Sequence, residues 1–277
     1  MKQLFLLIFA FCTYSFATAQ KAACCIKATD DFAALGNLKD FRMEHKAPLP
    51  FVYQSARGKD ISYQLPDGTT AHAFEIKAEQ STPYYILIIH EWWGLNDFVK
   101  QESEKLADTL HVNVLAIDLY DSKVATNSDE AVKYMQSVNN DRALKIINGA
   151  YNYMGNNAKV FTLGWCFGGG WSLQSALLGG SQVKGCIMYY GMPEQDVNKL
   201  KNLQCDVIGF FAQKDQRITP EVVHQFEQNM KAAGKNISVY EYDAGHGFAN
   251  PSNPVFDKAA REDTYAKELA FIKARMQ

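Results

Sequence analysis

Residues 164–169 read GWCFGG and place one cysteine between glycines where two sequence periodicities meet. The run from Lys159 to Gly164 is short and apolar, as in a buried strand, whereas Phe167 to Leu178 carries apolar residues at helical spacing. A strand that passes into a helix so abruptly needs glycines beside the turn, because a Cβ there would collide with the adjoining backbone. The pattern predicts that Cys166 lies at the tip of this turn as a nucleophile, with the helix N-terminus favouring its thiolate. A glycine-rich packing turn with an incidental buried cysteine is the alternative.

Apolar strand-like runs alternate with helical patterns over most of the chain, which predicts an α/β fold with a mostly parallel, doubly wound sheet flanked by helices. The predicted buried strands are Tyr84 to His90, Val112 to Asp118, Lys159 to Gly164, Val183 to Tyr190, Asp206 to Ala212 and Ile237 to Tyr242. The predicted helices are Asn96 to Leu110, Ser128 to Tyr153, Phe167 to Leu178, Pro220 to Ala233 and Phe256 to Ala274. An alternating segment from Ala71 to Ala78 predicts an antiparallel strand at the sheet edge.

A nucleophile on such a turn requires an acid and a histidine from loops after later strands, in that chain order. Asp215 follows the predicted strand that ends at Ala212, and His246 follows the one that ends at Tyr242. Asp243 is the competing carboxylate, but it lies too close to His246 in sequence to come from the preceding strand's loop. The spacing therefore predicts a Cys166, Asp215 and His246 triad.

The loop after the first buried strand, residues 90–94 (HEWWG), lies where a second oxyanion donor is expected. The backbone N–H groups of Trp92 and Phe167 are the predicted pair, since amides about 3 Å from a developing oxyanion stabilise it. Glu91 is expected to hold a proton or orient the resting thiol, with a surface ion pair as the alternative. His45, His72, His111 and His224 have no such context and are expected to be surface or capping groups.

Taken together, these motifs resemble the dienelactone hydrolase family of the α/β-hydrolase superfamily. The shared segments are residues 164–169, Glu91 with Gly94, 117–120 (IDLY), 189–191 (YYG) and 245–248 (GHGF). The resemblance extends from about Gly68 to the C-terminus. It implies that Cys166, Asp215 and His246 form the triad, and that Glu91 pairs with the resting thiol until substrate displaces it.

The chain departs from this family where arginines hold a substrate carboxylate. One such arginine directly follows the Phe-Ala after the catalytic histidine, and that position here is Asn250. The other has no counterpart near Ser128, although Arg142 lies further along, and Arg217 is a possible substitute or a surface residue. A neutral or larger substrate is therefore expected. The candidate pocket residues are Trp93, Tyr120, Tyr190, Arg217, Phe248 and Asn250.

These residues predict hydrolysis of a carboxylic ester or lactone through a thioacyl-enzyme, a reaction that requires no metal or organic cofactor. A phosphate-binding loop is excluded because Trp171-Ser172 replaces the Lys-Ser/Thr that would complete it. Two alternatives remain: a thiol-dependent redox or acyl-transfer enzyme, and a non-catalytic small-molecule binding protein on the same fold.

The first 19 residues predict a cleaved signal peptide, with an apolar run from Leu4 to Phe16 and small residues at 17–19. Export to a periplasm or the medium is expected, and the run is too short and too interrupted for stable membrane insertion. Residues 20–65 predict an N-terminal arm that wraps the surface of a domain at 66–277. Cys24 and Cys25 in this arm are expected to be structural, while Cys186 and Cys205 lie in apolar surroundings typical of buried cysteines.

The charge balance restricts the class of partner. A net charge of -2 provides no basic field to gather phosphates, so nucleic-acid binding is not expected. A small ester or lactone is the expected partner. One sequence carries no signal for the oligomeric state.

Overall fold

The computed structural model describes residues 27–48 and 50–276, so the predicted signal peptide and the Cys24-Cys25 pair lie outside the described residues. The strands are β1 (Lys59–Gln64), β2 (Thr70–Ile76), β3 (Tyr84–Ile89), β4 (Asn113–Ile117), β5 (Lys159–Trp165), β6 (Val183–Tyr189), β7 (Asp206–Ala212) and β8 (Ile237–Tyr242). The helices are α1 (Lys27–Leu35), α2 (Lys39–Glu44), α3 (Asp97–Leu110), α4 (Ser128–Ser137), α5 (Asn140–Met154), α6 (Phe167–Gly179), α7 (Val197–Leu200), α8 (Pro220–Ala232) and α9 (Lys258–Lys273), with a 3₁₀ turn at Gly180–Gln182.

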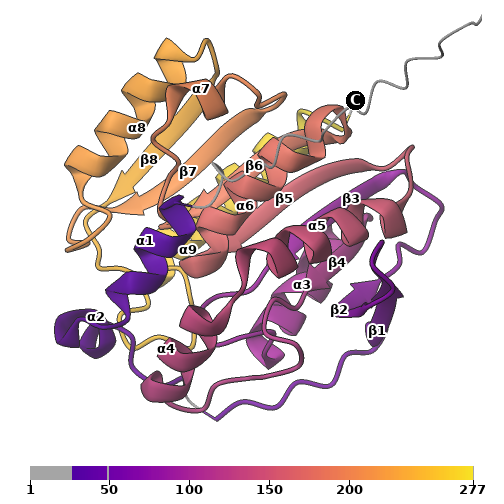
Figure 1. Ribbon diagram of the computed structural model, residues 1–277, viewed down its shortest axis with the longest axis horizontal. Helices are drawn as coiled ribbons and strands as arrows, with labels where there is room; N and C mark the ends of the chain where they lie inside the picture. The colour runs from indigo at the N-terminus through magenta and orange to yellow at the C-terminus, as the bar shows by residue number, and fades with distance from the viewer. Residues whose placement is uncertain (1–26, 49, 277) are drawn as a thin grey trace, which may run out of the picture.

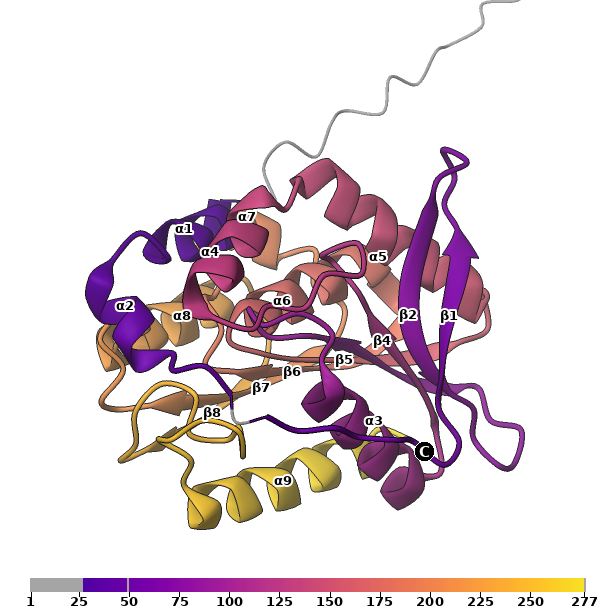
Figure 2. The ribbon, with the colours of Figure 1, turned by 90° about the horizontal axis from the view of Figure 1, so that it is seen from below.

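The strands form one sheet in the order β1-β2-β4-β3-β5-β6-β7-β8, which is parallel from β4 to β8 and antiparallel at β1 and β2 (Figure 1). The α/β fold and the mostly parallel sheet predicted from the sequence are confirmed. Helices α3 and α9 cover one face of the sheet, and α5 and α6 cover the other (Figure 2). The two central strands β3 and β5 are almost completely buried because both of their faces are covered.

Two details differ from the predicted elements. The antiparallel strand predicted at 71–78 is present as β2, but β1 pairs outside it and forms the edge. The single helical stretch predicted from Ser128 to Tyr153 is two helices, because Asn139 accepts a hydrogen bond from the Arg142 amide and begins α5 as its N-cap. The apolar periodicity reveals neither the extra strand β1 nor the division of the helix.

The N-terminal part of the described chain folds into two short helices, of which α1 lies against α4 and α6 (Figure 1). Phe32 in α1 and Phe41 in α2 are each only 2% exposed, so these helices bury apolar side chains against the domain. The chain then runs along α3, where the Tyr53 hydroxyl and the Ala56 amide donate hydrogen bonds to the buried Glu104 carboxylate. Residues 27–48 and 50–58, called the strap below, therefore lie across one end of the sheet.

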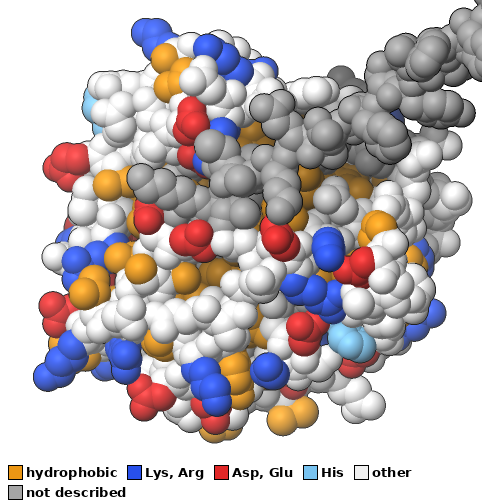
Figure 3. All heavy atoms as spheres, in the orientation of Figure 1, with side chains coloured by type: hydrophobic (Ala, Val, Ile, Leu, Met, Phe, Trp, Pro, Cys, Tyr) orange, Lys and Arg blue, Asp and Glu red, His pale blue; other side chains and the backbone are white. Residues whose placement is uncertain are grey.

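Blue and red side chains are interspersed on the face in Figure 3, with no large area of one sign. This distribution agrees with the small net charge of -2. Among the described residues, no helix combines the length and the apolar character needed to cross a membrane.

Candidate active site

Cys166 occupies the sharp turn between β5 and α6 that its flanking glycines predict. Its backbone lies at φ 56° and ψ −121°, a region that costs a non-glycine residue conformational energy. A Cβ on Gly164 would lie 2.0 Å from the Gly168 carbonyl oxygen, and one on Gly168 would lie 2.2 Å from the Ile89 carbonyl oxygen. The glycines are therefore required because β3, β5 and α6 meet at this turn with no room for side chains.

Asp215 and His246 come together as the strand order predicts. The His246 Nδ1–H donates to Asp215 Oδ2 over 2.6 Å, and both side chains are buried. Asp215 also accepts from the amides of Arg217 and Ile218, which hold the carboxylate toward the imidazole. The competing carboxylate, Asp243, is exposed and pairs with Lys214 at 2.8 Å. Of the two carboxylates, Asp215 orients the histidine.

The His246 Nε2 atom is buried and has no hydrogen-bond partner in the described part of the chain. His246 belongs to a group of three residues that could bind a metal ion, and their ligand atoms lie within 4.8 Å of one another. The other two are His45 and Cys166. Since Nδ1 is engaged by Asp215, Nε2 is the atom of His246 that is free to accept a proton from the sulfur.

His45 corrects a prediction from the sequence. It was expected at the surface or in a cap, but it is only 4% exposed and its Nε2 lies 3.6 Å from the Cys166 Sγ. Its ring packs against Trp92 at 4.5 Å and against His246 at 4.7 Å, measured between ring centroids. The short helix α2 carries His45 into the site, and a local pattern of sequence gives no sign of that placement. Of the other three, His111 is the left-handed C-cap of α3, as expected.

The buried setting changes the proton affinities at the site. Burial raises the pKa of the Cys166 thiol, although His246 opposes this shift, so the resting sulfur keeps its proton at neutral pH. Burial by itself would lower the pKa of His246, but the charges of Asp215 and of an ionised Cys166 outweigh it and raise that pKa. Burial, together with His246, lowers the pKa of His45 to about 3. His45 is therefore a neutral imidazole, while His246 is stabilised as an imidazolium once it takes the sulfur proton.

The two predicted oxyanion donors belong to the loop after β3 and to the first residue of α6. The Phe167 amide directly follows Cys166 at the start of α6, and it acts to lower the pKa of the Cys166 thiol against the larger effect of burial. The Trp92 amide lies in the loop after β3 and makes no hydrogen bond within the described ranges. His90, which precedes them, is fully buried and structural, since its Nδ1–H donates to the Glu91 carbonyl and its Nε2 accepts from the Leu119 amide. The loop around Trp92 is thereby fixed on β3.

Comparison with known proteins shows the family to which the chain belongs. Residues 72–276 match the model of the dienelactone hydrolase family. The chain is 25% identical over 201 residues to protein usf of Aquifex pyrophilus, covering 68% of this chain and 87% of that protein. It is 24% identical over 201 residues to carboxymethylenebutenolidase 1 of Cupriavidus pinatubonensis, covering 68% and 84%. This chain belongs to the dienelactone hydrolase family. A solved structure, the dienelactone hydrolase-like promiscuous phosphotriesterase P91 from metagenomic libraries, shares the fold with a TM-score of 0.69 at 18% identity, over 79% of this chain and 99% of that one.

The part of the chain that matches the dienelactone hydrolase family begins in β2, so the strap with His45 lies outside the match. The strap is nevertheless part of the site. Phe41 packs on the rings of His45 at 4.1 Å and Trp92 at 5.6 Å, and Phe32 packs on Phe41. With the strap in this position, Cys166 is only 2% exposed.

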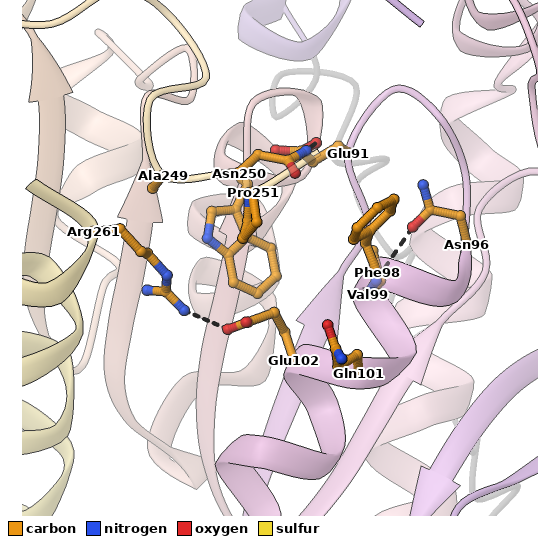
Figure 4. Close-up of a pocket in the computed structure, with 11 residues that line it drawn as sticks. Glu91, Asn96, Phe98, Val99, Gln101, Glu102, Ala249, Asn250, Pro251 and Arg261 are labelled. Atoms are coloured by element: carbon orange, nitrogen blue, oxygen red, sulfur yellow. Dashed lines mark hydrogen bonds and ion pairs between the residues drawn. The ribbon is translucent and has the colours of Figure 1, made fainter. Parts of the chain in front are cut away.

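Glu91 has different partners from those that the family resemblance implies. Its carboxylate accepts from the Asn250 side-chain amide and from the Tyr190 hydroxyl, and burial raises its pKa to about 7. Among the described residues it makes no ion pair with lysine or arginine, which rules out the surface-pair alternative. Glu91 and Asn250 point toward one another at one end of a pocket in this dienelactone hydrolase family member (Figure 4).

That pocket has mainly apolar walls. Phe98, Val99, Trp165, Ala249 and Pro251 line it between the Glu91–Asn250 pair and the ion pair of Arg261 with Glu102 (Figure 4). Of the pocket residues predicted from the sequence, Asn250 lines it. Trp93, Tyr120, Tyr190 and Phe248 are buried elsewhere around the site, where Tyr190 packs on His246 at 5.0 Å, and Arg217 is half-buried beside Asp215.

Proposed function

We propose that this protein hydrolyses an uncharged carboxylic ester or lactone, with Cys166 as nucleophile, His246 as general base and Asp215 as the residue that orients His246. The observation that carries the proposal is the buried, unpartnered Nε2 of His246, held by the Asp215 hydrogen bond next to a cysteine on a strained turn. A base with no other partner, beside a nucleophile held in an unfavourable backbone conformation, is typical of nucleophilic catalysis.

The proposed reaction has two halves. In the first, the Cys166 proton passes to His246, the sulfur attacks the carbonyl carbon, and the amides of Trp92 and Phe167 bind the oxyanion. The leaving oxygen then takes the proton from His246, which leaves an acyl group on the sulfur. In the second, His246 removes a proton from water, the hydroxide attacks the thioester, and the acid departs as the proton returns to the sulfur.

Charge recognition supports an uncharged substrate. Asn250 stands at the position of the family's carboxylate-binding arginine and is engaged with Glu91, so this end of the pocket offers no cation. Arg261, at the other end, is already paired with the carboxylates of Glu102 and Glu268. Arg142 pairs with Asp121 at 2.9 Å and donates to the Thr70 carbonyl, so its guanidinium is already engaged and does not replace the missing arginine. These observations disfavour a substrate whose carboxylate needs a bidentate arginine.

The closed strap implies a step before chemistry. Since Phe41 and His45 cover Cys166 in this structure, we propose that the strap shifts away from the sulfur when substrate enters and that the apolar pocket in Figure 4 receives the apolar part of the substrate. Such gating by a short segment is common among enzymes.

The test is turnover of an aryl acetate and of a neutral enol lactone by the wild type, Cys166→Ala and a thiol-alkylated sample, with Cys205→Ala as the matched control. We expect turnover by the wild type and the control only. Substrate binding without turnover in the wild type would favour a binding protein, and turnover that survives Cys166→Ala would exclude this nucleophile.

A second assay tests the substrate class. Asn250→Arg restores the family's arginine, and it should raise kcat/KM for a lactone that bears a carboxylate relative to its methyl ester. An unchanged ratio would mean that this position does not select for charge.

The proposal also places the protein outside the cytoplasm, after removal of residues 1–19. Determination of the N-terminal residue of protein recovered from the periplasm or the medium tests this, with Gln20 as the expected first residue. An intact Met1 in a cytoplasmic fraction would contradict it.

A further inference from the structure

His45, Cys166 and His246 form a set of ligand atoms that the hydrolytic reaction does not need. The proposed triad uses Asp215 as its third member, so His45 is an additional imidazole brought to the sulfur from the strap. All three side chains are at most 5% exposed, and their ligand atoms lie within 4.8 Å of one another. One thiol and two imidazoles thus form a buried cluster.

Both imidazoles contribute an unprotonated nitrogen to this cluster. The His45 Nδ1 lies 2.6 Å from the Phe41 carbonyl oxygen, which can only accept, so Nδ1 carries the hydrogen and Nε2 carries the lone pair. His246 is fixed in the same way by Asp215, and its Nε2 is buried without a hydrogen-bond partner among the described residues. Histidines that bind metals almost always donate their second N–H to a carboxylate or a backbone carbonyl. Both kinds of acceptor are present.

The separation between the sulfur and the His45 nitrogen suits a tetrahedral ion, and the His246 ligand atom lies within 4.8 Å of both. A zinc ion with bonds of about 2.3 Å to sulfur and about 2.0 Å to nitrogen at the tetrahedral angle separates those two ligand atoms by about 3.5 Å. The observed separation between Cys166 Sγ and His45 Nε2 is 3.6 Å. One thiolate and two imidazoles favour zinc or copper over magnesium or calcium, which prefer oxygen ligands.

We propose that His45, Cys166 and His246 bind a zinc ion that locks the strap over the nucleophile. Binding replaces the thiol proton: the sulfur becomes a thiolate bonded to zinc, one proton leaves to solvent, and both imidazoles remain neutral. The inference that zinc also stops turnover rests on the proposed function, because the ion occupies both the nucleophile and its base. Zinc binding itself is independent of the reaction.

The experiment measures zinc affinity by competition with a chromophoric chelator, using purified mature protein that has been stripped of metal. The variants are His45→Ala and His246→Ala, and the matched control is His224→Ala, an exposed histidine on α8. We expect one zinc per chain in the wild type and the control, and a loss of affinity of at least about 100-fold in both site variants. Cobalt as a probe should give a sulfur-to-metal charge-transfer band that Cys166→Ala abolishes.

The outcomes separate the two proposals. No stoichiometric zinc binding by the wild type, or equal affinity in His45→Ala, overturns the zinc site whatever the turnover assay shows. Zinc binding that depends on His45, in a protein that hydrolyses no ester, supports the site and removes the proposed function. Binding together with full turnover at saturating zinc would reject the blocking role.

Discussion

His45 Nε2 lies 3.6 Å from Cys166 Sγ, although 121 residues separate the two in sequence. The contact joins the strap, which lies outside the family match, to the turn that carries the nucleophile. Access to Cys166, the chemistry at its sulfur and the proposed metal site therefore all depend on how helix α2 packs.

The packing of α2 predicts how fast Cys166 reacts with reagents in solution. Phe41→Ala removes a ring that is 2% exposed and contacts both His45 and Trp92, which loosens the strap without cutting into the sheet. We expect alkylation of Cys166 to accelerate at least about tenfold, because a local opening cheaper by 1.4 kcal/mol is about ten times more populated. Mass spectrometry after timed alkylation measures this. Met43→Ala, on the same helix but 56% exposed, should leave the rate unchanged, and equal rates in both variants would contradict the lid role.

The choice of carboxylate predicts unequal effects of two aspartate substitutions on catalysis. Asp215→Asn keeps the shape but loses the charge that orients and stabilises the His246 imidazolium, so kcat should fall by about 10² to 10⁴. Asp243→Asn affects only an exposed pair with Lys214 and should change kcat less than about twofold. Steady-state kinetics on the aryl acetate compare the two. A larger loss in Asp243→Asn would reassign the acid.

Burial of Glu91 predicts a dependence of stability on pH. Its pKa in the folded protein is raised from 4.5 to about 7 by burial, so the folded state binds this proton more tightly than the unfolded state does. The contribution to stability is therefore full below about pH 4.5 and is lost as the pH rises to about 7. Glu91→Gln keeps an acceptor for Asn250 and removes this loss, on the order of 3 kcal/mol at most.

Urea unfolding at pH 5 and pH 8, with chelator present, measures that difference. The free energy of unfolding of Glu91→Gln relative to the wild type should rise between the two pH values, whereas Glu241→Gln, at an exposed position on β8, should show no such rise. A parallel response in both variants would mean that Glu91 does not carry the effect.

The turn at Cys166 predicts a strict requirement for glycine at 168. Gly168→Ala would place a Cβ 2.2 Å from the Ile89 carbonyl oxygen and 2.4 Å from that of His90, and backbone cannot give way as a side chain can. We expect a destabilisation above about 3 kcal/mol, measured by thermal unfolding. Gly245→Ala meets open space and should change stability by less than about 0.5 kcal/mol. A Gly168→Ala protein as stable as the wild type would show that the turn can widen.

Much of the architecture could be predicted because it depends on local signals. The six parallel strands agree with their predicted ranges to within about one residue, since continuous apolar runs mark strands that are buried on both faces. Two signals failed. The break between α4 and α5 depends on the cap at Asn139, and the outer position of β1 depends on pairing with β2. Neither the cap nor the strand pairing changes the spacing of apolar residues.

The sequence by itself determined the turn at Cys166, the chain order of Asp215 and His246, and the fold that brings them to one edge of the sheet. Glycine requirements and strand order act within the backbone, so they leave a readable pattern. Only the tertiary structure decided that His45 reaches the sulfur and that Glu91 pairs with Asn250. These contacts join side chains more than 100 residues apart. The first depends on how a short strap with no strong period packs against the finished domain, and the second on how the loops after β3 and β8 meet.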